Sequence, residues 1–179
     1  MKYFFVVVLL ALTGCATLPA PVEGGNAQFV VAAFAENETS VVDYSFRYQL
    51  KLEHQQSGET RLVEIRPSST RVSHLTMDLT PGDYCIVGYY SLPAFRSGHS
   101  YNYKPSLKEF NDCFTLPENR MSVWSLKFVI RKYESETVAG RIHQNFRIVP
   151  RTVEDREAIE KSLQRFKTFE LWQPLNWLN

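Results

Sequence analysis

Strict alternation of apolar and polar residues over positions 42–53 is the strongest periodic pattern in this sequence. Every second position is apolar: Val42, Tyr44, Phe46, Tyr48, Leu50 and Leu52. The positions between them are all polar or charged. Successive side chains of a strand point to opposite faces of a sheet, so the pattern predicts a β-strand with one face in the core and the other in solvent.

Weaker alternation and turn residues indicate further strands. Residues 56–59 form a polar turn, so residues 61–66 are expected to return as a hairpin partner. Other strands are expected at residues 29–34, 75–79, 84–89, 110–116, 121–131 and 140–149. Core-facing residues of the last two are Trp124, Leu126, Phe128, Ile130, Ile142, Phe146 and Ile148. Many short strands without intervening helices predict a mainly β fold, an antiparallel β-sandwich.

After Pro150 the period changes to that of a helix. The apolar residues Ile159, Leu163 and Phe166 recur at i, i+4 and i+7, so an amphipathic helix over about 153–167 is expected to dock through them. Residues 152–155, Thr-Val-Glu-Asp, resemble a capping box with aspartate in place of glutamate. The tail that follows carries Leu171, Trp172, Leu175 and Trp177, which would cover an edge of the core or anchor an interface.

The first fifteen residues follow a third pattern. Lys2 gives a basic start, residues 3–12 are an unbroken apolar run, and two small residues precede Cys15. This is the plan of a secretory signal. A spanning helix needs roughly 20 apolar residues, about twice the length of this run, so a retained transmembrane anchor is not expected.

Leu12-Thr13-Gly14-Cys15 resembles the lipobox of bacterial lipoproteins. The resemblance implies that residues 1–14 are removed and that the Cys15 thiol, a nucleophile suited to thioether formation, carries diacylglycerol. Because Ala16 rather than aspartate follows, it also implies the outer membrane, on its periplasmic face. The alternative is an ordinary secretory signal with a chance cysteine.

The chain is expected to hold one domain behind the lipidated cysteine. Residues 15–25 contain two prolines and two glycines, which predicts a flexible tether. Residues 26–179 are long enough to bury a sizeable core as a single domain.

Residues 79–84, Leu-Thr-Pro-Gly-Asp-Tyr, combine a Pro-Gly turn with the start of a strand. This run resembles a hairpin of prealbumin-like and carboxypeptidase-regulatory-like β-sandwich domains, and small bacterial lipoproteins carry a similar run. The resemblance implies a sandwich of the prealbumin or immunoglobulin type and implies no activity, because such folds host many functions.

Residues 91–111 interrupt the strand pattern and have no periodicity. A long irregular segment inside a compact domain is often functional. Its candidate binding residues are Phe95, Arg96, His99, Tyr101, Tyr103 and Lys104. The aromatic rings could stack on a sugar or pack on a protein, and the cations could meet carboxylates. The alternative is a solvated crossover loop between sheets.

The two cysteines left after acylation are Cys85 and Cys113. Export would place them where disulfides form, and a bridge would close the base of residues 91–111. The alternative is two buried free thiols that act as small apolar residues. Cys85 is expected to share its strand face with Val87 and Tyr89, which leaves both alternatives open.

The sequence contains no motif for catalysis, a cofactor or a metal. Its four histidines, at positions 54, 74, 99 and 143, lack metal-ligand spacing and are expected to be solvated. Nucleophile-elbow, dinucleotide-binding and phosphate-binding glycine motifs do not occur. With 20 basic and 19 acidic side chains the chain also lacks the basic excess that nucleic-acid binding needs.

These patterns favour a lipid-anchored cell-envelope protein that is not an enzyme and acts through contacts with another envelope protein at the membrane surface. One alternative is a periplasmic binder of a small ligand or glycan that uses residues 91–111. The other is an enzyme with an unrecognised site.

Overall fold

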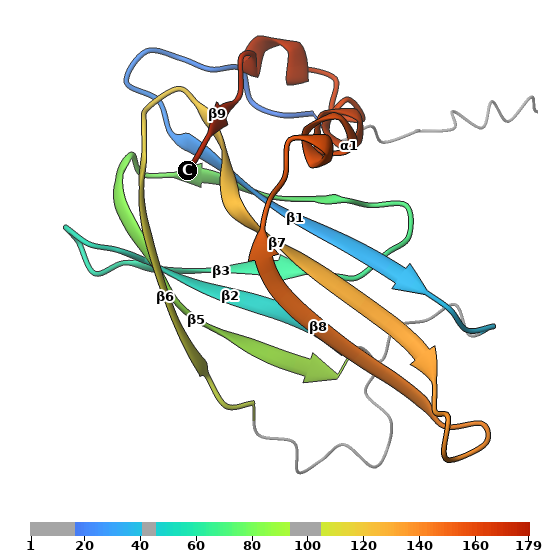
Figure 1. Cartoon of the computed structure of the whole chain (residues 1–179). Helices are drawn as coiled ribbons and strands as arrows, with labels where there is room; N and C mark the ends of the chain where they lie inside the picture. The colour runs from blue at the N-terminus through green and yellow to red at the C-terminus, as the bar shows by residue number, and fades with distance from the viewer. Residues whose placement is uncertain (1–16, 41–45, 94–104) are drawn as a thin grey trace, which may run out of the picture.

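The computed structural model describes residues 17–40, 46–93 and 105–179. These residues form two β-sheets, with one α-helix and a short 3-10 helix near the C-terminus (Figure 1). The fold is therefore mainly β with a C-terminal helix, as the periodic patterns predict. Within these ranges, no helix combines the length and apolar character that crossing a membrane requires.

One sheet is antiparallel throughout, in the order β3-β2-β5-β6. Its strands are β2 (Phe46–His54), β3 (Thr60–Ile65), β5 (Gly82–Pro93) and β6 (Lys108–Leu116). The alternation predicted over residues 42–53 is confirmed in β2, where Tyr48, Leu50 and Leu52 are buried. We call this the antiparallel sheet.

The second sheet is mixed, in the order β4-β1-β7-β8, with β9 also paired to β7. Its strands are β1 (Ala27–Asn37), β4 (Ser73–Leu79), β7 (Met121–Glu134), β8 (Ile142–Pro150) and β9 (Asn176–Trp177). β1 runs parallel to β7, and so does β9. The expectation of an antiparallel sandwich is wrong for this sheet, because alternation fixes the two faces of a strand but not the direction of its neighbour.

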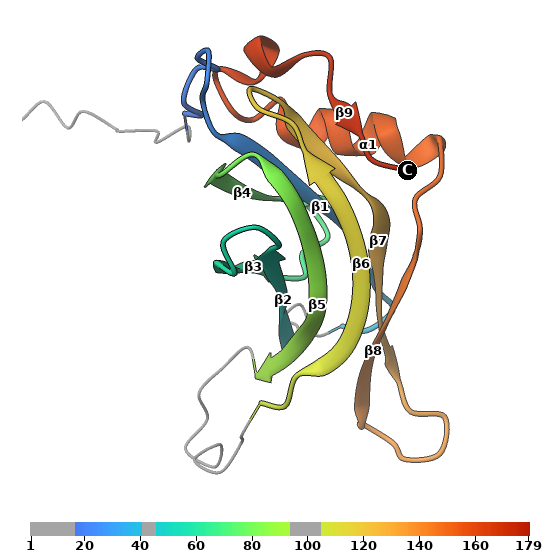
Figure 2. The same ribbon diagram turned by 90° about the vertical axis from the view of Figure 1, so that its left-hand side faces the viewer.

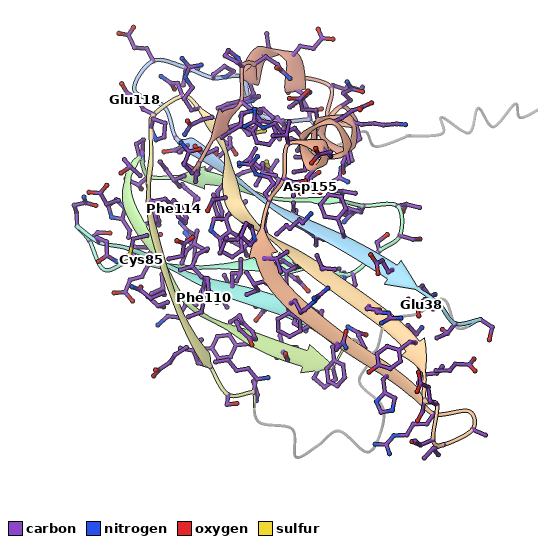
Figure 3. All side chains as sticks on the ribbon, viewed as in Figure 1. Glu38, Cys85, Phe110, Phe114, Glu118 and Asp155 are labelled. Carbon is purple, nitrogen blue, oxygen red and sulfur yellow. A yellow bond between two sulfur atoms is a disulfide. The ribbon has the colours of Figure 1, made fainter. Side chains whose placement is uncertain are left out.

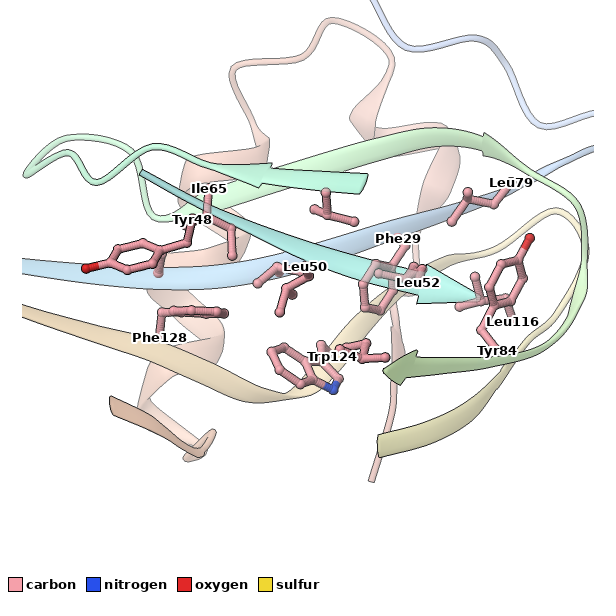
Figure 4. Packing of buried hydrophobic residues seen from close by; sticks show 14 of the residues in the cluster. Phe29, Tyr48, Leu50, Leu52, Ile65, Leu79, Tyr84, Leu116, Trp124 and Phe128 are labelled. Carbon is pink, nitrogen blue, oxygen red and sulfur yellow. The ribbon is translucent and has the colours of Figure 1, made fainter. Parts of the chain in front are cut away.

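Aliphatic and aromatic side chains together fill the space between the two sheets (Figure 4). Tyr48 of β2 packs on Phe128 and Phe146, with ring centroids 5.9 and 4.4 Å away. Phe29 of β1 stacks on Phe114 of β6 at 4.9 Å. Such contacts between rings from opposite sheets hold the layers in one arrangement, beyond the effect of apolar burial alone.

The helix α1 (Glu154–Leu163) covers the outer face of the mixed sheet (Figure 2). Ile159 and Leu163 are fully buried there, against outward-facing residues of β1 and β7 such as Val30 and Val123. The 3-10 helix η1 (Phe169–Trp172) extends the same cover. The helix is shorter than the expected 153–167, and Phe166 beyond its end is only partly buried.

Asp155 holds the start of α1, although not through a full capping box (Figure 3). Its carboxylate accepts a hydrogen bond from the backbone N–H of Thr152 at 2.6 Å, which is one of the two bonds of the box. The Thr152 hydroxyl donates to the same carboxylate, and no side chain caps the helix N-terminus. Lys127 of β7 also donates to Asp155, at 2.6 and 2.7 Å, and so ties the helix to the sheet.

Leu18 and Pro19, within the segment expected as a flexible tether, contact the C-terminal part of the chain. Leu18 is 1% exposed and belongs to the cluster under α1 and η1. The Thr168 hydroxyl donates to the Leu18 carbonyl at 2.6 Å, and the Trp172 indole donates to the Pro19 carbonyl at 3.0 Å. A flexible tether over 15–25 is therefore wrong at Leu18, because prolines and glycines prevent a helix but still allow an extended segment to bury one side chain.

Leu163→Ala is expected to lower the free energy of unfolding by about 2 to 4 kcal/mol, because it leaves a cavity between α1 and β7. The midpoint of urea unfolding measures this loss. The matched control is Leu62→Ala at a leucine that is 53% exposed, where a change below about 0.5 kcal/mol is expected. Equal midpoints for the two variants would show that the helix face is not packed.

Candidate binding surface

The two sheets differ in what covers their outer faces. α1, η1 and Leu18 cover the part of the outer face of the mixed sheet around Val30, Ala32, Met121 and Val123. Over the antiparallel sheet, the described part of the chain places no helix or strand on the outer face (Figure 2). Side chains of β2, β3, β5 and β6 that point away from the core therefore form an open surface, which we call the outer sheet face.

A hollow of about 500 Å³ lies on the outer sheet face. It is lined by Gln49, Lys51, Thr60, Leu62, Tyr90, Leu92 and Pro105. The strand register brings them together, because Lys51 pairs with Leu62 on one side of β2 and Gln49 pairs with Tyr90 on the other. Leu62 is 53% exposed, so a large apolar side chain among the residues that line this hollow is in contact with water.

A second hollow, of about 550 Å³, adjoins the first and shares Lys51. It is lined by Lys51, Glu53, Val87, Leu107, Glu109, Phe110 and Asn111. The register of β5 shifts here against both neighbours, which marks a bulge around Val87. Gly88 permits it: its φ is 156°, and a Cβ at this position would lie 2.6 Å from the Lys108 carbonyl oxygen.

The bulge corrects one predicted strand face. Alternation placed Tyr89 on the same face as Cys85 and Val87. In the structure Tyr89 packs on the core cluster, with its ring edge-on to Phe146 at 5.1 Å. The extra residue in β5 moves every side chain after it to the opposite face, so Tyr90 rather than Tyr89 lines the outer sheet face.

A disulfide joins Cys85 and Cys113 in the structure (Figure 3). The two residues are direct partners across β5 and β6, with Cα atoms 4.0 Å apart. The bridge links the neighbouring strands β5 and β6 on the outer sheet face, where Cys113 is exposed. It also closes the chain segment that contains residues 91–111.

Both thiols are expected to resist alkylation until the protein is reduced. The Cys85→Ala/Cys113→Ala double variant should lose about 3 to 4 kcal/mol of stability in the chain-entropy model, since the bridge spans 28 residues. Peptide mapping of the envelope fraction under non-reducing conditions measures the first effect, and urea unfolding the second. Two free thiols in the unreduced protein would contradict the bridge.

Hydrogen-bonded charged and polar side chains lie at both ends of the outer sheet face. Glu64 accepts from Arg47 at 2.6 Å and from Arg66 at 2.9 Å. The hydrogen bond from Arg66, together with that from Arg47, holds the pKa of Glu64 below its ordinary value against the opposing effect of burial. At the other end Asp83 accepts from the Thr115 hydroxyl at 2.6 Å. An apolar centre with a polar rim is the usual anatomy of a protein interface.

The candidate binding residues chosen from the sequence lie outside the described residues. This holds for Phe95, Arg96, His99, Tyr101, Tyr103 and Lys104, and also for the lipidation residue Cys15. The described chain does show that β5 ends at Pro93 and that Pro105 lines the first hollow. Sequence reasoning missed Leu62, although an apolar residue in the outward phase between Thr60 and Glu64 was a usable signal.

Two histidines expected at the surface are buried. His54 lies with Nδ1 2.8 Å from the Ser57 hydroxyl and its ring edge-on to Tyr84. Burial lowers the pKa of His74 to about 4, and the nearby Arg71 and Arg165 act in the same direction, so its imidazole is neutral at physiological pH. No group of three or more metal-ligating side chains occurs within residues 17–40, 46–93 and 105–179.

Comparisons with models of protein families, with curated proteins and with solved structures found no match for this chain.

Proposed function

We propose that this chain is a lipid-anchored cell-envelope protein that acts by binding another envelope protein through the outer sheet face. The unequal covering of the two sheets supports this proposal. The chain's own C-terminal segment covers the apolar part of one outer face. On the other outer face, Leu62 is exposed, and Tyr90 and Leu92 are half-buried. Exposed apolar groups with a paired polar rim are typical of surfaces that bind proteins.

The chemistry of the outer sheet face suits a contact site. Tyrosine is enriched among the residues that contribute most to binding, and leucines surrounding it can exclude water. The cross-strand disulfide fixes β5 against β6, so little conformational freedom is lost when a partner binds. Lys51, Glu53 and Glu109 give mixed charge, which favours a partner with polar groups at its rim over nucleic acid.

The lipid anchor is the second part of the proposal. It rests on the resemblance of Leu12-Thr13-Gly14-Cys15 to a lipobox and places the domain on the periplasmic face of the outer membrane. If the protein and its partner are held in the same envelope, tethering raises their effective concentration. The outer sheet face then needs only a modest intrinsic affinity for the partner.

Affinity purification from crosslinked envelopes tests the contact. The wild type is expected to retain specific partner proteins that Leu62→Glu loses, because partner binding would bury a carboxylate beside apolar side chains. The matched control is Val138→Glu, at a valine that is 48% exposed in the β7–β8 connection. If Leu62→Glu and Val138→Glu retain the same proteins as the wild type, the outer sheet face is not the interface.

The hollow beside Tyr90 favours a second candidate, a small ligand or glycan. Its volume of about 500 Å³ lies in the range of small-molecule sites, and an aromatic ring there could stack on a sugar. A glycan array probed with wild type and Tyr90→Ala separates the two candidates. Binding that is lost in Tyr90→Ala, with unchanged protein partners, would favour the ligand.

A further inference from the structure

The N-terminal segment is fixed to the folded domain at Leu18, three residues after the proposed lipidation site Cys15. Leu18 is buried, and its carbonyl accepts from Thr168. The next carbonyl, of Pro19, accepts from the Trp172 indole. Both donors lie in the C-terminal segment around η1, so the chain enters the domain at one defined place.

The distance from this place to the membrane is short. Cys15 and Leu18 are three peptide units apart, and each unit spans 3.8 Å, so their Cα atoms are at most about 11 Å apart. Acyl chains on Cys15 would hold that residue at the bilayer surface. An 11 Å reach is smaller than the domain, so the side of the domain around Leu18 must face the lipid.

Two exposed apolar side chains flank the entry point. Leu171 is 57% exposed, and its backbone N–H bonds the carbonyl of Thr168, the residue whose hydroxyl holds Leu18. Val22 is 63% exposed and lies three residues beyond Pro19. Single exposed apolar residues are common, but these two stand beside the one place where the bilayer would be within reach.

From this geometry we propose that the end of the domain formed by residues 18–22 and 167–173 rests on the phospholipid surface, with Val22 and Leu171 inserted among the headgroups. The proposal rests on lipidation at Cys15. We call this end the membrane-proximal end.

The charge at the membrane-proximal end specifies the kind of surface. The exposed charged residues at or beside this end, in residues 17–26, the β6–β7 turn and residues 164–173, are Glu23, Glu118, Arg120, Arg165, Lys167 and Glu170. Acidic and basic side chains are equal in number, so no polybasic attraction to anionic lipid operates. The contact is with zwitterionic headgroups, depends on the two apolar side chains and the anchor, and is insensitive to salt.

This orientation leaves the opposite end of the domain clear of the membrane. Figures 1 and 2 both show the β7–β8 connection and the C-terminal end of β5 at the end of the molecule opposite η1. Leu92, at that end of β5, lines the first hollow. A partner can therefore reach the outer sheet face without competing with lipid.

Photo-crosslinking of the lipidated full-length protein tests the orientation. Benzoylphenylalanine is placed in three separate variants, at position 171, at position 22 and, as the matched control, at position 138. Each protein is reconstituted in vesicles of deuterium-labelled phosphatidylcholine. We expect labelled phospholipid adducts at 171 and 22 in at least tenfold excess over 138, unchanged by 0.5 M salt. The label distinguishes vesicle lipid from the protein's own acyl chains.

A flexible Gly-Ser linker of 15 residues inserted after Ala16 is expected to reduce the adducts at 171 several-fold, because the domain can then turn away. Mass spectrometry first identifies the group on Cys15. Absence of lipid there overturns the proposed anchor and this orientation together. If Cys15 carries lipid, two results would overturn the orientation alone. One is an equal yield of phospholipid adducts at positions 171 and 138, and the other is a linker variant that crosslinks to phospholipid as well as the wild type does.

Discussion

Cys15→Ala is expected to shift the protein from the membrane fraction to the soluble fraction. The proposed acyl chains attach through the Cys15 thiol and the amino group that cleavage creates, and alanine offers no thiol. Each buried methylene stabilises membrane binding by roughly 0.8 kcal/mol, so loss of the chains removes the anchor altogether. Fractionation followed by mass spectrometry of the N-terminal peptide measures the change.

The Cys85→Ala/Cys113→Ala variant is the control for this experiment. Those two sulfurs are bonded to each other, so their removal should leave membrane association intact. A wild-type protein whose N-terminus carries no lipid, at Cys15 or elsewhere, would contradict the lipobox interpretation.

Asp155→Ala is expected to lower the free energy of unfolding by about 3 to 5 kcal/mol. The change leaves the Lys127 ammonium without its carboxylate partner at the junction of β7 and α1, where the two side chains are only 14% and 11% exposed. A buried charge that loses its partner typically costs this much. The backbone N–H of Thr152 would also lose its acceptor.

Glu157→Ala provides a matched control in the same helix. Glu157 is an exposed carboxylate in the first turn, so its loss affects only the weak interaction with the helix dipole. A change of less than about 1 kcal/mol is expected there. Comparable losses for the two variants in urea unfolding would show that the Lys127–Asp155 pair does not hold the helix.

The Lys127–Asp155 pair also makes the free energy of unfolding depend on pH. Burial raises the pKa of Asp155, but hydrogen bonds from Lys127 and Thr152 outweigh it and hold the pKa below the ordinary value. The stabilisation by the Asp155 carboxylate is therefore complete at any pH above about 3.9, the pKa of this carboxyl in the unfolded chain. It is lost as the pH falls through the lower pKa that the carboxyl has in the folded protein. The stability gap between wild type and Asp155→Asn should be wide at pH 6 and narrower at pH 3.

Local periodicity was sufficient to predict strands and helix but not their neighbours. The alternation in β2 and β7 and the helical spacing of Ile159 and Leu163 each depend on a few residues in sequence. These residues are buried as expected, except for Phe46 and Leu126, which are only partly buried. The parallel pairing of β1 with β7 joins residues such as Gln28 and Met121. The sequences of β1 and β7 do not indicate that these two strands pair, because pairing depends on the packing of the whole sheet.

The sequence was also insufficient to predict which side chains of β5 lie on the outer sheet face. Gly88 inside an apolar run was a signal for a bulge, since glycine weakens a strand and accepts close backbone approach. Without locating the bulge, alternation carried the wrong phase past Val87 and grouped Tyr89 with Cys85 and Val87 on one strand face, whereas Tyr89 packs on the core and Tyr90 lines the outer sheet face. Leu18 was missed for a related reason: a single apolar residue has no period, and only its contacts with Thr168 and Trp172 show that it is buried.

The parallel pairing of β1 with β7 has a consequence for the order of folding. The β2–β3 and β5–β6 pairs join consecutive strands, so they can form by closing short or moderate loops. β1 can pair with β7 only after the chain between them has folded back, so the mixed sheet is expected to form more slowly than the antiparallel sheet. The Cys85–Cys113 bridge lies wholly within the early pair, so oxidation can precede completion of the core. Acid-quenched refolding, with the disulfide timed against hydrogen-exchange protection of β1, would reveal that sequence, and protection of β1 before oxidation would refute it.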